Sequence, residues 1–252
     1  MKLKTGLTVC TFALLASSAG ICFAAHPLIS DDAGVLGKGT IQGELNGDIS
    51  YDKKTVNGST TKTNGAQLAA TIGVGATDTL DLVFGLTRPW GSGSTDGVLF
   101  NDAGSTDFAL TMKWQVLLHE GFSIAVKPQF GYSYAVGQKD DHTLSYGAGL
   151  VLSKEFERLA LHLNAGYVYN DYNRADVRDA CREGIGSFSL AATYKVVEHM
   201  KLAADIGAST SADKSSNEMP IFGLVGFIHN VENHTLRVWS CGLAMPVPYG
   251  SG

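Results

Sequence analysis

Long runs in which apolar and polar side chains alternate constrain this chain more than any other feature. From Ile41 to Tyr51 every second residue is apolar or glycine, and every residue between them is polar. Successive side chains of a β-strand point to opposite faces, so this run predicts a strand with one apolar and one polar face. The pattern recurs, and we expect eleven strands near 41–51, 67–74, 80–87, 107–118, 123–134, 143–153, 159–169, 187–195, 200–210, 219–229 and 235–244.

Strand length and connection length separate a membrane barrel from a soluble sandwich. Most of these runs reach about ten residues, which a tilted membrane strand needs, whereas globular strands average about five or six. Short connections are expected near 75–79, 119–121, 154–158, 197–199 and 230–234. Long polar connections are expected near 52–62, 88–106, 135–142, 172–182 and 210–218. Alternating short and long connections favour an all-β fold, an antiparallel transmembrane β-barrel of about twelve strands with short periplasmic turns.

Aromatic residues support the same interpretation, because rings with a polar tip favour the interface between bilayer and water. The ring-bearing residues that fall near the long-loop ends of their strands are Tyr51, Trp90, Phe108, Tyr132, Tyr134, Tyr146, Tyr167, Tyr169 and Trp239.

The first 24 residues predict a secretory signal peptide. Lys2 and Lys4 precede a short apolar stretch, and small residues follow it. We expect cleavage after Ala24, a periplasmic or lumenal segment over 25–38, and the barrel over 39–252. A lipid anchor on Cys22 is the less favoured alternative, because Ile21 does not suit the motif.

Charge and cysteine content exclude several classes of protein. The chain has 19 basic and 24 acidic residues, and loss of Lys2 and Lys4 leaves 17 basic residues and a formal charge of −7. Such a chain offers no basic surface for nucleic acid. The mature chain keeps only Cys181 and Cys241, so it is no disulfide scaffold, although a bond between these two is topologically allowed. No cofactor is expected.

The strand count raises a question about the C-terminus. Bacterial single-chain barrels have an even number of strands, and residues 245–252 contain two prolines and two glycines, which make a poor strand. We therefore expect either that a closing strand is missing, as in a truncated or frame-shifted twelve-stranded parent, or that the count is off by one.

The start of the mature chain resembles a known family. Residues 25–34 read Ala-His-Pro-Leu-Ile-Ser-Asp-Asp-Ala-Gly, Leu36-Gly37-Lys38-Gly39 follows, and the first strand begins directly afterwards. This is similar to bacterial outer-membrane barrels assigned to transport, including those linked to the meta-cleavage pathway of phenol degradation. The resemblance is sharpest over 26–51, extends to the hairpin at 221–226, and does not cover the C-terminus. It implies a barrel that transports a solute, without naming the solute.

Polar residues on the inward faces are candidates for lining the lumen. They are Gln42, Glu44, Asn46, Asp48, Asp81, Lys113, Gln115, Lys127, Gln129, His162, Asn164, Lys195, Asp205 and Arg237. A lumen of about twelve strands lies between filled and channel-forming widths. Lumen width leaves a channel and a filled barrel about equally supported. The family resemblance favours a channel or transporter for small molecules, hydrophobic or aromatic ones among them. The alternative is a filled structural barrel whose loops bind partners. Outer-membrane lipid and lipopolysaccharide are the expected surroundings, and the oligomeric state stays open.

Catalytic and metal-binding interpretations are weaker. Ser187, Ser189, His162 and Asp205 all face inward, but no nucleophile or zinc motif accompanies them, so no enzyme is predicted. His26 with Asp31 and Asp32 has metal-binding chemistry, yet a leader with an Asp-based turn is favoured, and no metal site is predicted. Asp140, Asp141, Asp176 and Asp179 in the loops could bridge lipopolysaccharide through divalent cations or form a solvated surface.

Overall fold

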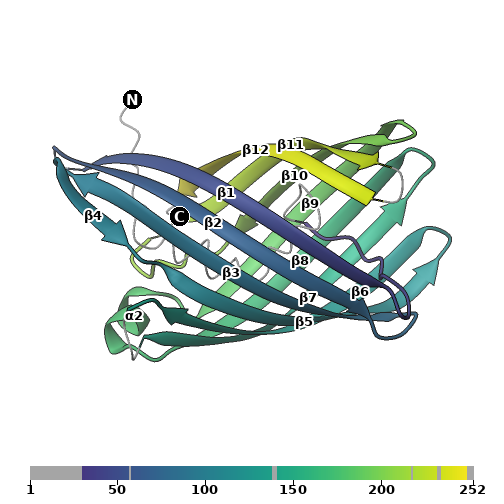
Figure 1. Ribbon diagram of the computed structural model, residues 1–252, viewed down its shortest axis with the longest axis horizontal. Helices are drawn as coiled ribbons and strands as arrows, with labels where there is room; N and C mark the ends of the chain where they lie inside the picture. The colour runs from purple at the N-terminus through teal and green to yellow at the C-terminus, as the bar shows by residue number, and fades with distance from the viewer. Residues whose placement is uncertain (1–29, 57, 138–140, 217, 232–233, 249–252) are drawn as a thin grey trace.

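The protein, seen in a computed structural model, consists almost wholly of antiparallel β-strands (Figure 1). The structure describes residues 30–56, 58–137, 141–216, 218–231 and 234–248, with the backbone alone for 52–56, 218, 229–231 and 234–248. The elements are β1 (Ile41–Val56), β2 (Ser59–Gly75), β3 (Leu80–Thr95), β4 (Val98–Asp102), β5 (Ser105–His119), β6 (Phe122–Ala135), β7 (His142–Glu155), β8 (Leu159–Tyr172), α2 (Ala175–Ala180), β9 (Gly184–Val197), β10 (Met200–Ser209), β11 (Glu218–Val231) and β12 (His234–Pro248).

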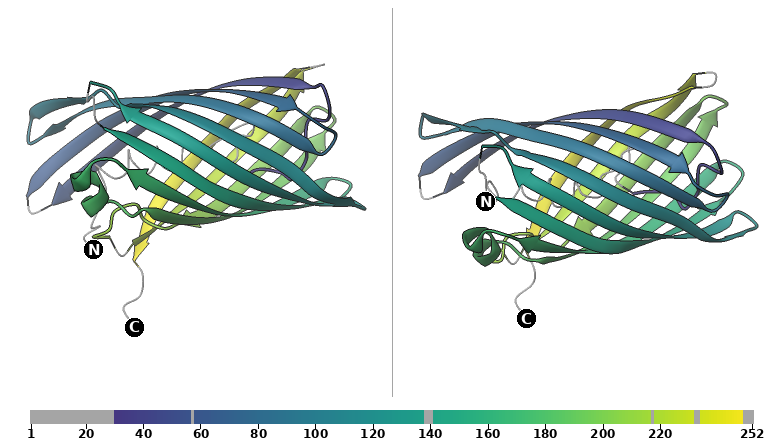
Figure 2. Two further views of the ribbon diagram at one scale, coloured as in Figure 1. Left: turned by 90° about the horizontal axis from the view of Figure 1, so that it is seen from below. Right: turned by 60° about the horizontal axis from the view of Figure 1, so that its bottom comes forward.

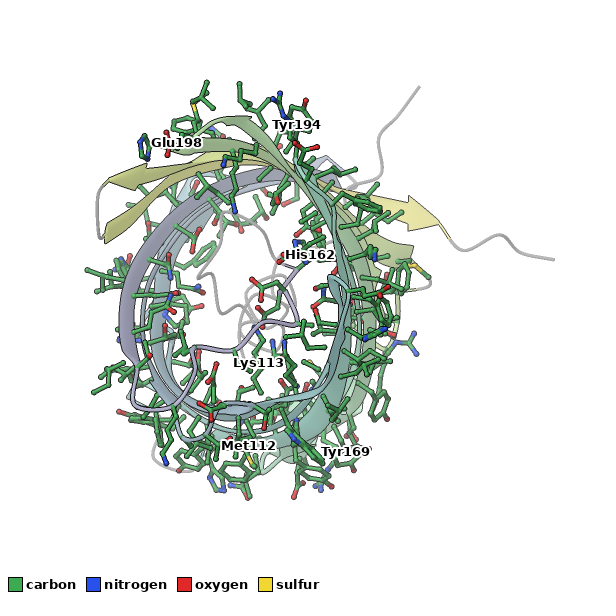
Figure 3. The ribbon with its side chains drawn as sticks, turned by 90° about the vertical axis from the view of Figure 1, so that its right-hand side faces the viewer. Met112, Lys113, His162, Tyr169, Tyr194 and Glu198 are labelled. Carbon is green, nitrogen blue, oxygen red and sulfur yellow. The ribbon has the colours of Figure 1, made fainter. Side chains whose placement is uncertain are left out.

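The strands form one sheet whose order follows the chain. The order runs β1-β2-β3-β5-β6-β7-β8-β9-β10-β11-β12. The short strand β4 is outside this order and pairs with β3. The sheet curls around a central lumen, as the views along and across its axis show (Figures 2 and 3). The eleven strands of the path coincide with the eleven expected from alternation, so the predicted antiparallel barrel fold is confirmed. In the described part of the chain, no helix is long and apolar enough to cross a membrane.

Side-chain direction follows the predicted alternation. Leu45 is 72% exposed and Ile49 is 91% exposed on the outer face, although both are strongly apolar. On β5, Met112 points outward while its neighbour Lys113 points into the lumen (Figure 3). An apolar exterior with a polar interior inverts the arrangement of a soluble protein and suits a strand surrounded by lipid.

Two of the predicted long loops are instead strand extensions. The expected loops at 52–62 and 88–106 consist of the upper parts of β1 and β2 and of β3 and β4, which meet at tight turns. Asp96 and Gly97 both have positive φ, the requirement of a type I′ hairpin turn. The dipeptides at 57–58 and 96–97 are Asn-Gly and Asp-Gly, the strongest short-range hairpin signal, so the sequence contained this information. We call this end of the barrel the hairpin end and the opposite one the short-turn end.

The C-terminal expectation also needs correction. Residues 245–248 were expected to be a poor strand, but β12 continues to Pro248, with Pro246 opposite Pro220. β1 and β12 are the two ends of the sheet order, and proline is tolerated on such an edge because one side of the strand needs no ladder bond. Ten antiparallel pairings separate the two edges, so β1 and β12 run in the same direction.

The aromatic residues form a belt on the outer face toward the hairpin end. The rings of Phe108 and Tyr134 stack with centroids 6.4 Å apart, and those of Tyr146 and Tyr169 lie 5.3 Å apart. Trp90 is 43% exposed on the same side of the wall. This belt marks where the lipid-facing surface meets water, and the strand extensions lie beyond it.

Candidate functional site

A short segment before β1 occupies the lumen. Residues 30–39, here the lumen segment, turn inward at the short-turn end, where the Gly39 N–H donates to the Gly75 carbonyl at 2.8 Å. Gly37 and Gly39 both adopt positive φ, which lets the chain reverse there without steric cost. A Cβ at Gly75 would lie 1.8 Å from the Gly37 carbonyl oxygen, so this close approach requires glycine on the wall as well.

Asp31 anchors the segment to two lysines on adjacent strands. Its carboxylate lies 2.6 Å from Lys127 Nζ and 3.1 Å from Lys113 Nζ, and Asp32 lies 3.3 Å from Lys113. The Lys127 side chain is only 7% exposed. Its charge therefore needs a partner in the lumen, since an unpaired buried ammonium is costly. Asn164 adds a two-way contact, accepting from the Asp31 N–H and donating to the Asp31 carbonyl.

The ionisation of Asp31 is set by opposing effects. Burial raises the pKa of Asp31, but the charges of Lys113 and Lys127 outweigh burial and hold that pKa well below its usual value. A carboxylate with a depressed folded-state pKa contributes stability above its unfolded pKa, near 4, and loses that contribution as the pH falls toward the folded value. Asp31 therefore stays ionised and paired throughout the neutral and mildly acidic range.

The pairing of Asp31 with its two lysines predicts how conductance depends on pH. Reconstituted protein is expected to show the same conductance at pH 8 and pH 5, because the anchor keeps its charges across that interval. A rise is expected only below about pH 4, where protonation of Asp31 begins to compete with its pairing. Bilayer recordings at stepped pH would measure this. A conductance change centred near pH 6 would contradict it and would implicate a histidine instead.

A second anchor lies deeper in the lumen. The Ser30 N–H and hydroxyl both donate to the Asp205 carboxylate, each at 2.7 Å, and the hydroxyls of Ser30 and Ser189 lie 2.6 Å apart. All three residues are buried. A carboxylate that accepts both a backbone and a side-chain hydrogen bond from one residue fixes that residue in position as well as in orientation.

The middle of the segment is held by further contacts. The Ala33 N–H donates to Ser153 Oγ at 2.9 Å, and Gln115 Nε2 donates to the Ala33 carbonyl at 2.9 Å. Ala33 is fully buried in a small apolar cluster with Ala125 and Val151. Ser153 lies 2.8 Å from His162 Nδ1. Nearer the rim, the Leu36 N–H donates to Asp81 at 2.8 Å.

Half of the predicted lumen residues converge on this segment. Six contact it directly, and His162 joins through Ser153; the six are Asp81, Lys113, Gln115, Lys127, Asn164 and Asp205. The rest lie elsewhere. Gln42, Glu44, Asn46 and Gln129 are half-buried, with Gln42 donating to Glu44, whereas Asp48 and Lys195 are exposed. Arg237 lies opposite Ile228 in the ladder, and its side chain is outside the described residues.

Sequence reasoning missed Ser30 and Ser153 as contact residues. Ser153 occupies an inward position of the predicted strand 143–153. The alternation of that strand could therefore have identified Ser153 as a lumen-facing residue. The favoured Asp-based turn is present, since Asp32 Oδ1 accepts from the Gly34 N–H at 2.8 Å. Sequence reasoning did not foresee that the same carboxylates also bind lysines, Asp31 both Lys113 and Lys127 and Asp32 Lys113. The described residues contain no cluster of three metal-ligating side chains, and His26 lies outside them.

The remaining chemical candidates have different hydrogen-bond partners. Ser189 and Asp205 both contact Ser30, whereas His162 contacts Ser153. The Ser, His and Asp considered as a catalytic set therefore hold the lumen segment at two different places.

In the loops, Arg174 pairs with Asp141 at 3.0 Å and with Asp176. Hydrogen bonding from Arg174 lowers the pKa of Asp176. Asp140 lies outside the described residues. Cys181 is buried, and the Cys241 side chain is not described, so the disulfide stays a prediction.

Comparison with solved structures supports the fold. The chain is similar to the COG4313 outer membrane channel from Pseudomonas putida F1, with a TM-score of 0.59 and 16% identity over 86% of this chain and 91% of that chain. It also matches the translocator domain of the autotransporter NalP from Neisseria meningitidis, at a TM-score of 0.42 and 11% identity over 75% and 76% of the two chains. No family model matches the sequence, and comparison with curated proteins gives no significant match. The first likeness establishes an outer-membrane barrel fold.

Proposed function

We propose that the protein is an outer-membrane channel for small solutes, and that the lumen segment forms the constriction of its pore. The observation that carries this proposal is the set of contacts from residues 30–36 to inward side chains of β3, β5, β6, β7, β8 and β10. A segment bound to the wall on so many sides narrows the passage where it lies. Because residues 30–36 belong to no β-strand of the wall, the segment can move without breaking a ladder of the barrel.

The lining indicates the class of solute. Side chains that face the lumen are mostly small or polar, among them Ala69, Thr71, Ala109, Thr111 and Ser133. Such a surface stays hydrated and offers hydrogen bonds along the path, which favours small polar solutes. Aromatic solutes follow from the family resemblance alone. The alternative function is a barrel filled by its N-terminal segment, whose exposed hairpins bind partners, and conductance separates the two.

The experiment is single-channel recording of the mature, refolded chain in planar bilayers, with charge changes at Gln129. This half-buried side chain lies two residues beyond Lys127 on β6, so it faces the same lumen without joining the Asp31 anchor. We expect discrete conductance steps, with Gln129→Glu shifting selectivity toward cations and Gln129→Lys toward anions, each by roughly twofold or more in permeability ratio.

Lys154→Glu is the matched control. Lys154 lies on the outer face near the short-turn end and donates to the Glu120 carbonyl, so its reversal should leave selectivity unchanged. A barrel that inserts stably but remains silent would favour the filled-lumen alternative. Conductance steps with the same ion selectivity in the parent and in both Gln129 variants would show that ions pass outside this lumen.

A further inference from the structure

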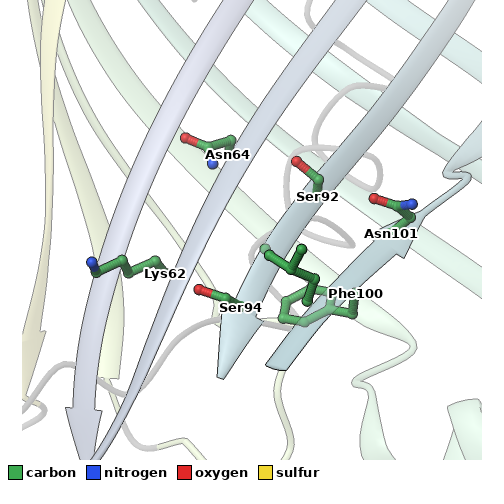
Figure 4. A pocket seen from close by; sticks show the side chains of 8 residues that line it. Lys62, Asn64, Ser92, Ser94, Phe100 and Asn101 are labelled. Carbon is green, nitrogen blue, oxygen red and sulfur yellow. The ribbon is translucent and has the colours of Figure 1, made fainter. Parts of the chain in front are cut away.

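The outer face of the strand extensions carries a pocket whose lining is partly polar and partly apolar. It has a volume of about 370 Å³ and lies on β2, β3 and β4 at the hairpin end (Figure 4). Its lining includes Lys62, Asn64, Ser92, Ser94, Leu99 and Asn101. Cavities of a few hundred cubic ångströms are the size that small ligands occupy.

The ladder register shows that this pocket faces away from the lumen. Lys62 and Asn64 share parity on β2 with Leu68 and Ile72, which are exposed, apolar and lipid-facing. The β2–β3 ladder runs without a register shift, so Ser92 and Ser94 lie on that same outer face. Their β4 partners, Asn101 and Leu99, complete it. The pocket therefore opens on the outside of the wall.

Its height along the wall is set by Trp90 and Tyr51. Both rings belong to the aromatic belt and are exposed on the outer face. Ser92 lies two positions beyond Trp90, and Asn64 is the ladder partner of Tyr51, so the pocket starts at the level of the belt. The hairpin end faces the cell exterior in barrels with short periplasmic turns. Residues just beyond the belt at this end therefore lie among the headgroups of the outer leaflet.

The charge of this face is positive although the whole chain is acidic. Lys62 is exposed, and its register partner on β1 is Lys53. Arg88, also on the outer face, extends toward the pocket end and donates to the Ser105 carbonyl. Among the residues that line the pocket Lys62 is the charged one, so an anion there would meet a positive charge; the Asp96 carboxylate at the adjoining turn is bound by Ser59 and Thr60.

The pocket is also held in shape before any ligand arrives. Asp96 at the β3–β4 turn accepts hydrogen bonds from the Ser59 hydroxyl and the Thr60 N–H, at 2.6 and 2.7 Å, which ties the two hairpin tips together. On the lumen side of the same wall, Gly93 lies under the Phe100 ring, and a Cβ there would approach ring atom Cζ to 2.4 Å, so the wall behind the pocket is closely packed. A preorganised site loses less freedom on binding.

We propose that this pocket binds the phosphorylated sugar headgroup of lipopolysaccharide in the outer leaflet. The cations match phosphate, and the amides and hydroxyls of Asn64, Asn101, Ser92 and Ser94 match sugar hydroxyls. The apolar wall beneath the belt meets the acyl chains of the same molecule. One lipid thus satisfies both surfaces, which a soluble anion cannot do.

The test is binding of radiolabelled rough lipopolysaccharide, with its lipid A and core phosphates intact, to the detergent-solubilised mature chain. We expect saturable binding, about tenfold weaker for Lys62→Glu and weakened to a lesser degree for Lys62→Ala and Asn64→Ala, as loss of a charge-assisted hydrogen bond predicts. Lys154→Glu should bind as the parent does, because that lysine lies near the short-turn end. The heat-dependent gel shift of folded barrels confirms that each variant is folded.

Two probes identify the ligand chemistry. Dephosphorylated lipopolysaccharide should bind at least tenfold more weakly, and millimolar inorganic phosphate should fail to displace the intact lipid. Equal binding by Lys62→Glu and the parent, or by the dephosphorylated lipid, would overturn the proposal. Full displacement by inorganic phosphate would show a site for free anions and overturn it as well. None of these outcomes depends on whether the lumen conducts.

Discussion

Asp31→Asn is expected to open the lumen of the folded barrel. The substitution keeps the size of the side chain but removes the charge that pairs with Lys127 and Lys113, while Asp32 keeps its 3.3 Å contact with Lys113. Breaking a buried pair by removing one charge costs about 3–5 kcal/mol, and the nearby lumen water reduces this to roughly 2–3 kcal/mol. The equilibrium between bound and released lumen segment should then shift by roughly 30- to 150-fold.

The measurement is single-channel conductance at neutral pH, recorded as the fraction of time spent in the highest conductance level. Asp32→Asn is the matched control, since the Asp32 side chain is 34% exposed and makes one 3.3 Å contact with a lysine. We expect the control to change that fraction by less than about threefold, the effect of a weak exposed pair. Equal behaviour of the two variants would show that the Asp31 anchor does not hold the constriction.

Met112→Lys is expected to impair insertion strongly. Met112 lies on the outer face of β5, one residue from Lys113, which points inward (Figure 3). A lysine on the lipid face near the middle of the bilayer costs about 2–4 kcal/mol. The free energy of unfolding in lipid vesicles should therefore fall by about that amount, and the folded fraction on gels should fall with it.

Gln115→Lys places the same charge on the inner face of the same strand and serves as the control. Gln115 is half-buried and donates to the Ala33 carbonyl, a contact that an ammonium can also make. We expect a loss of less than about 1 kcal/mol for this variant and for Met112→Leu, a volume-conserving change. Equal destabilisation by lysine at positions 112 and 115 would refute the assignment of the two faces.

Sequence alone determined the wall of this protein. The alternation of Glu44 and Leu45, of Met112 and Lys113, and of their counterparts on other strands fixes which face of each strand meets lipid, because side chains in a strand alternate strictly. Short connections at 76–79 and 120–121 then pair neighbours in order. The Asp96-Gly97 dipeptide also encoded its hairpin, although composition suggested a loop there.

Only the tertiary structure decided what the lumen contains. Asp31 meets Lys113 and Lys127 across separations of 82 and 96 residues, and Ser30 meets Asp205 across 175. Local patterns report the face on which a side chain lies, but not which distant strand stands opposite it. That depends on the curl of the whole sheet and on the direction in which the N-terminal segment enters. The wall residues of the anchors could therefore be listed as inward candidates from sequence, but only the curl of the sheet around the N-terminal segment joins them into one site.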